Sequence, residues 1–295
     1  MKVSILIISK NRKADLHFTL NRLNTLIDKS IHEVLVLLDG CEDDSNMLVK
    51  QLPWVNWTVL NKSIGASAAR EILYKKSQGD ILIGFDDDAH PLQNNFIEIV
   101  EDQFNKDESI GVIAFQEIKG IYKNDSEALA SKPKKQLHYL CKEFVGCGFA
   151  IKKSTYFNTR GFPVWVDIYG EESCVSIEVI ANGEKILYTN NISVNHRVDM
   201  AARKKAGNNY FRFEKQLKNT LFYYLVYYKY PAIKILKLIY HNFFKYAIKD
   251  FSFFKGFVFA ISQAIFKFPN VLKYRKPIAT KFIELKDKLP SPIFY

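Results

Sequence analysis

The stretch Asp80-Ile-Leu-Ile-Gly-Phe-Asp-Asp-Asp88 decides the fold, because an apolar run ends there in three carboxylates. The apolar part predicts a buried strand, with the acids directly after its carboxyl end. Three adjacent carboxylates repel one another unless a cation neutralises them. Hard divalent ions take carboxylate oxygens and leave coordination sites for phosphates, so Asp86, Asp87 and Asp88 indicate a Mg²⁺ or Mn²⁺ site that holds a diphosphate. The alternative is a solvated acidic turn that caps the following helix.

The sequence around this stretch alternates between strand and helix patterns. Apolar runs that predict strands lie at residues 3–8, 33–38, 56–60, 80–85 and 111–115, and helical spacing of apolar residues lies at 16–27, 66–77 and 94–104. Strands separated by helices of this length form βαβ units. We therefore expect an α/β fold with a Rossmann-like, mostly parallel sheet and flanking helices, in which ligands bind beyond the carboxyl ends of the strands.

The pattern is less regular after the fifth predicted strand. Residues 119–137 are rich in Lys, Ser and Asn and predict a mobile surface loop. An apolar run returns at 144–151, a helix is expected to end near residue 181, and strands are expected at 185–188 and 192–195.

Polar residues follow the predicted strands. Ser9 and Asn11 come after the first strand, and Asp39 comes after the second. A carboxylate at Asp39 can accept hydrogen bonds from a nucleobase or ribose, or it can cap a helix or form an Asx turn. Gly65–Arg70 opens the third helix, where a positive helix N-terminus and an arginine favour a phosphate or nucleotide. The sequence has neither a dinucleotide-binding glycine fingerprint nor a Walker P-loop.

Together these segments resemble the family 2 glycosyltransferases, which have the GT-A fold. The resemblance rests on the order and spacing of residues 3–12, 33–40, 65–70 and 79–88, and Gly161-Phe162 and Gly170-Glu171-Glu172 extend it to about residue 196. It implies an inverting, metal-dependent transfer of one sugar from a nucleotide-diphosphate sugar. No Q-x-x-R-W motif of the processive synthases is present, which favours transfer of a single sugar.

The resemblance also implies roles for individual residues. Asp39 would hydrogen-bond the base, while Asp86 and Asp88 would be the acids of the D-x-D motif, with Asp88 on the metal. His196 resembles a histidine that often faces the metal and the diphosphate, although a structural histidine is the alternative. The residues expected to contact the donor are Ser9, Asn11, Asp39, Arg70, Asp86 and Asp87, and those expected at the metal are Asp88, Asp86 and His196.

The acidic pair after Gly170 would supply the catalytic base. Glu172 matches the second acid of the family's pair, which usually takes the proton of the acceptor hydroxyl, and Glu171 is the other candidate. Both could also be first-turn residues that favour the helix dipole. The sequence departs from the family at Lys10, at Leu38 and at Cys41.

The net charge of +11 is unevenly distributed. Residues 1–202 carry 23 basic and 27 acidic side chains, whereas residues 203–295 carry 19 and 4, together with 24 Phe and Tyr. We therefore expect a GT-A domain over 1–202 and a basic, aromatic helical tail over 203–295. Lysines beside aromatics suit a bilayer interface, so the tail is expected to dock on an anionic membrane surface or on the acceptor. Simple packing on the catalytic domain is the alternative, and without a recognised motif no nucleic acid partner is expected.

The sequence also bears on the compartment. The longest uncharged apolar run, residues 256–266 between Lys255 and Lys267, has 11 residues and is too short to span a bilayer. The first apolar run lacks the length and cleavage site of a signal peptide, and the four cysteines match no zinc pattern. We expect reduced thiols and a cytoplasmic protein that lies peripherally on the inner face of the cell membrane.

Two other functions stay open at this point. A nucleotidyltransferase that makes the activated sugar would usually carry a glycine-rich loop after the first strand, which residues 9–13 lack. A non-catalytic membrane or nucleic-acid adaptor would turn over no nucleotide sugar. Contacts of Asp39 would suit uracil or thymine, so UDP- or dTDP-sugars are the favoured donors. The resemblance implies a glycan or lipid-linked acceptor in bacterial surface polysaccharide or lipopolysaccharide biosynthesis.

Overall fold

The computed structural model describes residues 1–132, 135–199, 202, 205 and 208–293. Its strands are β1 (Val3–Ser9), β2 (Glu33–Asp39), β3 (Asn56–Leu60), β4 (Ile81–Asp86), β5 (Ala89–Pro91), β6 (Ile110–Lys119), β7 (His138–Leu140), β8 (Gly148–Lys152) and β9 (Lys185–His196). Its α-helices are α1 (Lys13–Leu26), α2 (Leu48–Gln51), α3 (Ala66–Lys76), α4 (Phe96–Lys106), α5 (Asp125–Ala130), α6 (Lys153–Asn158), α7 (Glu171–Ala181), α9 (Asn208–Tyr227), α10 (Ala232–Lys245), α11 (Phe251–Leu272) and α12 (Thr280–Lys288).

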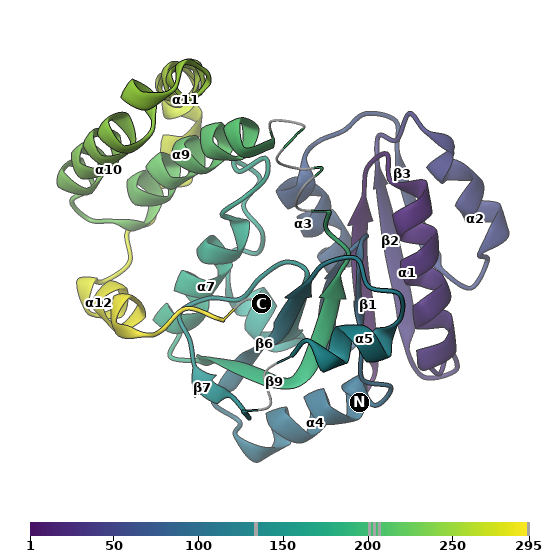
Figure 1. Cartoon of the computed structure of the whole chain (residues 1–295). Helices are drawn as coiled ribbons and strands as arrows, with labels where there is room; N and C mark the ends of the chain where they lie inside the picture. The colour runs from purple at the N-terminus through teal and green to yellow at the C-terminus, as the bar shows by residue number, and fades with distance from the viewer. Residues whose placement is uncertain (133–134, 200–201, 203–204, 206–207, 294–295) are drawn as a thin grey trace.

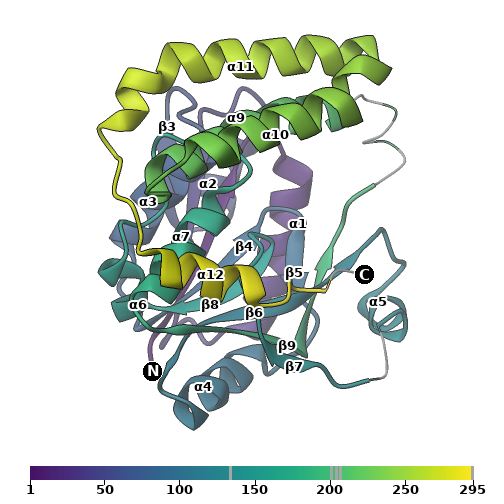
Figure 2. The same cartoon turned by 90° about the vertical axis from the view of Figure 1, so that its left-hand side faces the viewer.

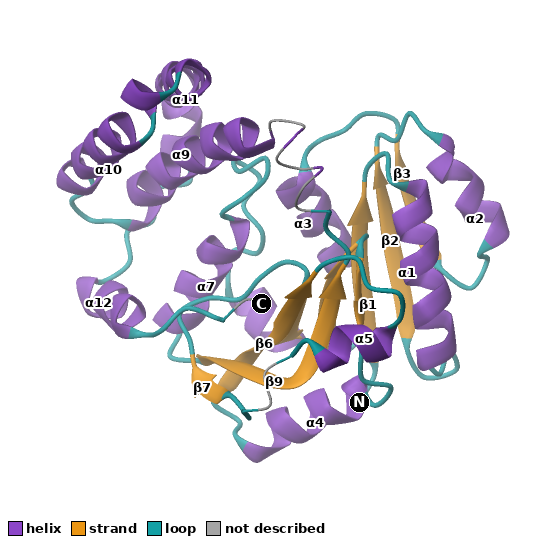
Figure 3. Cartoon of the chain, viewed as in Figure 1, coloured by secondary structure: helices purple, strands orange, loops and turns teal. Residues whose placement is uncertain are grey.

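One sheet of nine strands runs through the N-terminal two-thirds of the chain (Figure 3). The strand order is β3-β2-β1-β4-β8-β6-β9-β5, with β7 paired to β9. The strands β3, β2, β1 and β4 are parallel, whereas β8 is antiparallel to both β4 and β6. The predicted α/β fold is therefore confirmed, and its sheet is mixed beyond β4.

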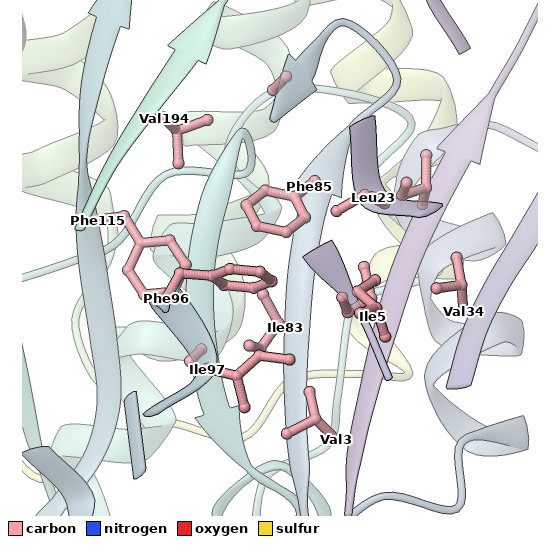
Figure 4. Close-up of a cluster of buried hydrophobic side chains, with 14 of the residues drawn as sticks. Val3, Ile5, Leu23, Val34, Ile83, Phe85, Phe96, Ile97, Phe115 and Val194 are labelled. Atoms are coloured by element: carbon pink, nitrogen blue, oxygen red, sulfur yellow. The ribbon is translucent and has the colours of Figure 1, made fainter. Parts of the chain in front are cut away.

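Alternation along the strands divides the core into two layers. Ile5 and Ile83 belong to the cluster that packs against α1 and α4, which Figure 4 shows around Phe85 and Phe96. Leu6 and the other strand residues whose side chains lie on the opposite face of the sheet pack against α3 and α7. Each fully buried side chain of this size stabilises the fold by about 1.5–3 kcal/mol, so these layers fix the strand register.

The structure corrects three details of the sequence-based expectation. Residues 119–137 do not form a continuous loop, because α5 lies within them. The Asn124 side chain caps the N-terminus of α5 by accepting a hydrogen bond from the Glu127 amide. The two strands expected over 185–195 are one strand, β9, whose register against β6 shifts between Phe115 and Gln116. The three-residue strands β5 and β7 are too short to carry a periodic signal.

The C-terminal region is helical, as expected. Helices α9, α10 and α11 pack together beside the sheet, and α12 returns to α7 (Figures 1 and 2). The last described residues return to the sheet, where the Tyr188 hydroxyl donates to the Ile293 carbonyl at 3.0 Å. The expected boundary between residues 202 and 203 falls beside positions outside the described residues, and it stays a prediction.

Helix α11 overturns one expectation of the sequence. It has 22 residues, and by length and composition it is apolar enough to cross a membrane, the one such helix in the described part of the chain. Lys255 and Lys267 interrupt the uncharged run without ending the helix, which is why the run of 256–266 underestimates its length. Core helices of soluble proteins can meet the same criterion, but most of α11 is not buried in the protein.

Candidate active site

The three consecutive acids lie at the carboxyl edge of the sheet beside the end of β1, where Ile8 pairs with Asp86. Asp87 is turned into the protein and accepts a hydrogen bond from the Ser9 hydroxyl at 2.7 Å. The Arg12 guanidinium contacts Asp87 at 3.0 Å and Asp88 at 2.7 Å. Burial raises the pKa of Asp87 to about 7, although Arg12 and Ser9 oppose the shift. Asp87 and Ser9 therefore hold the turn together, and their predicted contact with the donor stays a prediction.

Asp86, Asp88 and His196 form the cluster that the sequence predicts for the metal. One ligand atom from each lies within 4.8 Å of the others, and His196 Nε2 is 3.1 Å from Asp88 Oδ1. Although burial opposes it, the hydrogen bond and charge of His196 and the charge of Arg12 hold the pKa of Asp88 well below its usual range. Two carboxylates with one imidazole fit a divalent cation of the Mn²⁺ type.

Glu117 and Lys119 join this cluster without having been predicted. The Glu117 carboxylate is hydrogen-bonded to His196 Nδ1, and Lys119 Nζ lies 3.1 Å from the other Glu117 oxygen. Burial alone would lower the pKa of His196, but its hydrogen bonds to Asp88, Cys147 and Glu117 raise it to about 12. The interaction with Nδ1 turns Nε2 of the ring toward Asp88, as an orienting carboxylate does in many metal sites.

Arg70 connects the acids of the D-x-D motif to the acidic pair. Its guanidinium donates to Asp86 at 2.7 Å, to Glu171 at 2.8 Å and to Glu172 at 3.3 Å. Gly146 makes room for this arrangement, since a Cβ there would lie 2.5 Å from Glu172 Oε1. These four charged residues, each predicted separately for the site, thus lie together at one edge of the sheet.

The two glutamates differ in exposure. The Glu172 side chain is 20% exposed, whereas that of Glu171 is 3% exposed. Burial raises the pKa of both, and the charge of Glu172 raises that of Glu171 further. Glu171 Oε2 finds no hydrogen-bond partner among the described residues. Glu172 is therefore the member of the pair that a substrate can reach more easily.

Asp39 and Asn11 fasten the loops around this edge. Asp39 accepts hydrogen bonds from the Ser63 hydroxyl at 2.7 Å and from the backbone amides of Ile64 and Gly65 at 2.8 and 3.1 Å. Asn11 has a left-handed backbone (φ 55°), and its side-chain oxygen accepts from the Glu42 amide at 2.7 Å. Much of the acceptor capacity of Asp39 is thus used within the protein, while its contact with a base stays a prediction.

The sheet order and the position of the acids at its carboxyl edge are those of the GT-A type of fold. The sequence model of glycosyl transferase family 2 matches residues 4–158, which is more than half of the chain. The chain belongs to this family, and its function is that of a glycosyltransferase. No protein with curated functional data matches it significantly in sequence.

Solved structures of glycosyltransferases share the fold at low sequence identity. The mannosyltransferase PcManGT from Pyrobaculum calidifontis, in complex with GDP-Man and Mn²⁺, has a TM-score of 0.59 at 15% identity, covering 89% of this chain and 74% of that one. TarS 1–349 from S. aureus in complex with UDP-GlcNAc has a TM-score of 0.59 at 14% identity, covering 90% and 81%. GalNAc-T7 with UDP, GalNAc and Mn²⁺ has a TM-score of 0.55 at 18% identity. The match covers 67% of this chain and 44% of the length of GalNAc-T7.

Proposed function

We propose that this protein transfers a single sugar, with inversion, from a nucleotide-diphosphate sugar to a hydroxyl of a glycan or lipid-linked acceptor. The observation that carries the proposal is the Arg70 guanidinium, which joins Asp86 to Glu171 and Glu172 within 3.3 Å. Asp86 and Asp88, which suit a metal-bound diphosphate, thereby lie at the same edge of the sheet as Glu171 and Glu172, which suit proton transfer. The nucleotidyltransferase and adaptor alternatives are less well supported, because the chain belongs to a glycosyltransferase family.

A divalent cation would be held by Asp86, Asp88 and His196. When bound, it would act as a Lewis acid that stabilises the charge of the diphosphate leaving group. The imidazole nitrogen in the donor set favours Mn²⁺ over Mg²⁺, since Mg²⁺ prefers oxygen ligands. Two of the structural neighbours contain Mn²⁺, which agrees with this choice.

Glu172 is the favoured catalytic base. It would take the proton of the acceptor hydroxyl while that oxygen bonds to the anomeric carbon and the carbon–diphosphate bond breaks on the opposite face. Such general bases contribute roughly 10²–10⁴-fold to the rate. The greater exposure of Glu172 supports this role, whereas the buried Glu171 is better suited to holding Arg70 in place.

The nucleobase of the sugar donor would bind near Asp39, and we favour UDP- or dTDP-sugars as donors. The structural neighbours bind UDP-GlcNAc in one case and GDP-Man in another, so the shared fold accommodates both base classes. A carboxylate accepts hydrogen bonds from the imide nitrogen of uracil or thymine. Ser9 is less suited to donor contact, because its hydroxyl is directed to Asp87.

The α10–α11 surface would bind an anionic membrane. Residues 229–276 carry ten basic side chains and one acid, Asp250. The exposed apolar residues of the two helices are Ile233, Leu236, Tyr240, Phe244, Phe251, Phe254, Val258, Phe259, Ile265, Phe266, Phe268 and Leu272. Between the helices lies an apolar groove of about 620 Å³, lined by residues that include Leu236, Tyr240 and Phe257.

We favour interfacial over transmembrane insertion for α11. One side of the helix, including Phe257 and Ala260, packs against Phe213 and Leu217 of α9, and a helix that crosses the bilayer would lose these contacts. Aromatics at headgroup level with lysines near anionic lipids are typical of interfacial helices. The protein would then lie on the inner face of the cell membrane and act there on a lipid-linked precursor of a bacterial surface glycan.

Thermal unfolding of the full chain with UDP-, dTDP- and GDP-sugars, each with and without Mn²⁺, tests the donor proposal. We expect one uridine or thymidine donor to raise the Tm only when Mn²⁺ is present, and Asp88→Ala to remove the shift. Co-sedimentation of the full chain with anionic and neutral liposomes tests the membrane proposal. No metal-dependent shift with any donor would overturn the transferase mechanism, and equal binding to both liposomes would overturn the electrostatic docking.

A further inference from the structure

We infer that Lys218 and Asn219 of α9 are positioning residues for the catalytic carboxylates, so that the C-terminal helical region completes the active site. The inference rests on the proposed function, since it concerns the placement of Glu171 and Glu172. Both carboxylates stand in the first turn of α7, directly after residues 163–170, which we call the α7 entry loop. The contacts of this loop with α9 carry the argument.

Asn219 binds the backbone of the entry loop. Its side-chain amide donates to the Ile168 carbonyl at 2.7 Å, to the Tyr169 carbonyl at 3.0 Å and to the Asp167 carboxylate at 3.2 Å. The side chain comes from a helix some 50 positions further along the chain, and the residue is only 2% exposed. Buried amides of this kind fix a loop, because releasing it leaves its carbonyls without partners.

Lys218 adds a charge pair to the same loop. Its ammonium lies 2.7 Å from Asp167 Oδ2, and Lys215 Nζ lies 3.2 Å from the same oxygen. Although burial opposes it, the hydrogen bond to Lys218 and the charges of both lysines hold the pKa of Asp167 well below its usual range. The backbone carbonyl of Asp167 accepts from the Ser67 amide at 3.3 Å. One residue of the loop is therefore held from α9 and from α3, the helix that carries Arg70.

The backbone conformation shows why the loop needs external contacts. Tyr169 has φ 68° and Gly170 has φ 106°, so two successive residues are left-handed just before α7 begins. A tyrosine adopts this conformation only when its surroundings impose it. The Asn219 amide holds the Tyr169 carbonyl, and the Arg212 guanidinium lies 4.9 Å from the centre of its ring. Both contacts come from α9.

Loss of these contacts would shift the carboxylates. Glu171 and Glu172 follow Gly170 directly, and both share the Arg70 guanidinium. Misplacement of a catalytic group by about 1 Å can cost roughly 10²-fold in rate. In the metal cluster Asp86 ends β4, Asp88 lies in the turn before β5 and His196 ends β9, and the α9 contacts described above do not involve these residues. The proposal therefore predicts an effect on turnover that is separate from donor and metal binding.

The test compares Lys218→Met and Asn219→Leu with the wild-type full chain. Lys218→Met keeps the approximate side-chain volume and Asn219→Leu keeps the branched shape of the side chain. The apolar contact of Phe222 and Val226 with Ile177 of α7 remains to hold α9 in place. We expect kcat to fall about 10- to 100-fold while the donor KM and the Mn²⁺ Kd change less than about threefold. Backbone amides of residues 165–172 should exchange hydrogen faster, and Lys218→Arg should recover most of the activity.

Thr220→Val is the matched control, since Thr220 is the next residue of α9 and its hydroxyl bonds within the helix to the Gln216 carbonyl. It should leave kcat and exchange unchanged. An unchanged kcat in Asn219→Leu together with faster exchange would overturn the inference, and so would an equal loss in kcat, donor KM and Mn²⁺ affinity. A wild-type protein that transfers no sugar from any donor would instead overturn the proposed function itself, before any variant is compared.

Discussion

The carboxyl edge of the sheet and the α10–α11 surface differ in how their charges are balanced. At the edge, Arg70 lies 2.7 Å from Asp86, and Arg12 and His196 lie 2.7 and 3.1 Å from Asp88. The segment that forms the α10–α11 surface, residues 229–276, contains ten basic residues and one acid. Charges balanced within the protein build a site for a small ligand, whereas an unbalanced excess attracts an external anionic partner. The net charge of +11 for the whole chain therefore reflects the basic excess of the second region and not the balanced charges of the first.

The largest effect is expected from removing a charge at the sheet edge. Asp88→Ala should lower the transfer rate by at least about 10³-fold, because the metal loses a ligand and the leaving group loses its electrostatic stabilisation. Donor-dependent release of nucleotide diphosphate measures the loss. Asp44→Asn is the control, since the Asp44 side chain is 78% exposed. Activity within tenfold of wild type would contradict the assignment of Asp88.

The two glutamates should separate in a pH profile. Glu172→Gln is expected to lower kcat by about 10²–10⁴-fold, because no group remains to take the acceptor proton. Burial raises the pKa of Glu172, and the base must be deprotonated, so the rate of the wild type should rise with pH at higher values than for an exposed glutamate. Glu171→Gln should retain more activity and keep this acid limb. The assignment is reversed if Glu171→Gln alone removes the limb.

The carboxylate behind the metal cluster should have an intermediate effect. Glu117→Gln is expected to weaken Mn²⁺ binding by about 10- to 100-fold, since the orientation and basicity of His196 depend on its partner. Calorimetric titration of the full chain with Mn²⁺ measures the change without relying on activity. Glu127→Gln, at the N-terminus of α5, is a control away from the cluster. Unchanged Mn²⁺ affinity in Glu117→Gln would show that His196 is oriented by other contacts.

The tail should respond to apolar changes rather than to loss of a single charge. Ile265 and Phe266 are 71% and 81% exposed on α11, so their joint replacement by Ser should leave folding intact. Binding to anionic liposomes should weaken at least about tenfold, because each inserted side chain contributes about 1.5–3 kcal/mol. Transfer to a soluble acceptor should be unchanged. Equal liposome binding by the double variant and wild type would place the contact surface elsewhere.

The sequence predicts what is encoded locally and misses what the fold brings together. The strand and three acids of 80–88 are predictable, because apolar residues and carboxylates follow one another directly. Glu117 is not predictable as a partner of His196, since 79 positions separate them and the β6–β9 register joins them. Asn219 is missed for the same reason, because its partners lie some 50 positions away in the sequence and nothing local marks it among the basic and aromatic residues of the tail.

The smallest expected effect is on stability and concerns His90 of β5. His90 is fully buried, and this burial lowers its pKa to about 4, partly opposed by Asp125. Because the folded-state pKa lies below the value of about 6.5 in the unfolded chain, the stabilisation is complete above that pH and is lost as the pH falls toward 4. The free energy of unfolding should drop by about 1 kcal/mol between pH 7 and 5.5 from this residue alone. Urea unfolding of wild type and His90→Gln at both pH values isolates the contribution, and a difference between them that does not change with pH would contradict it.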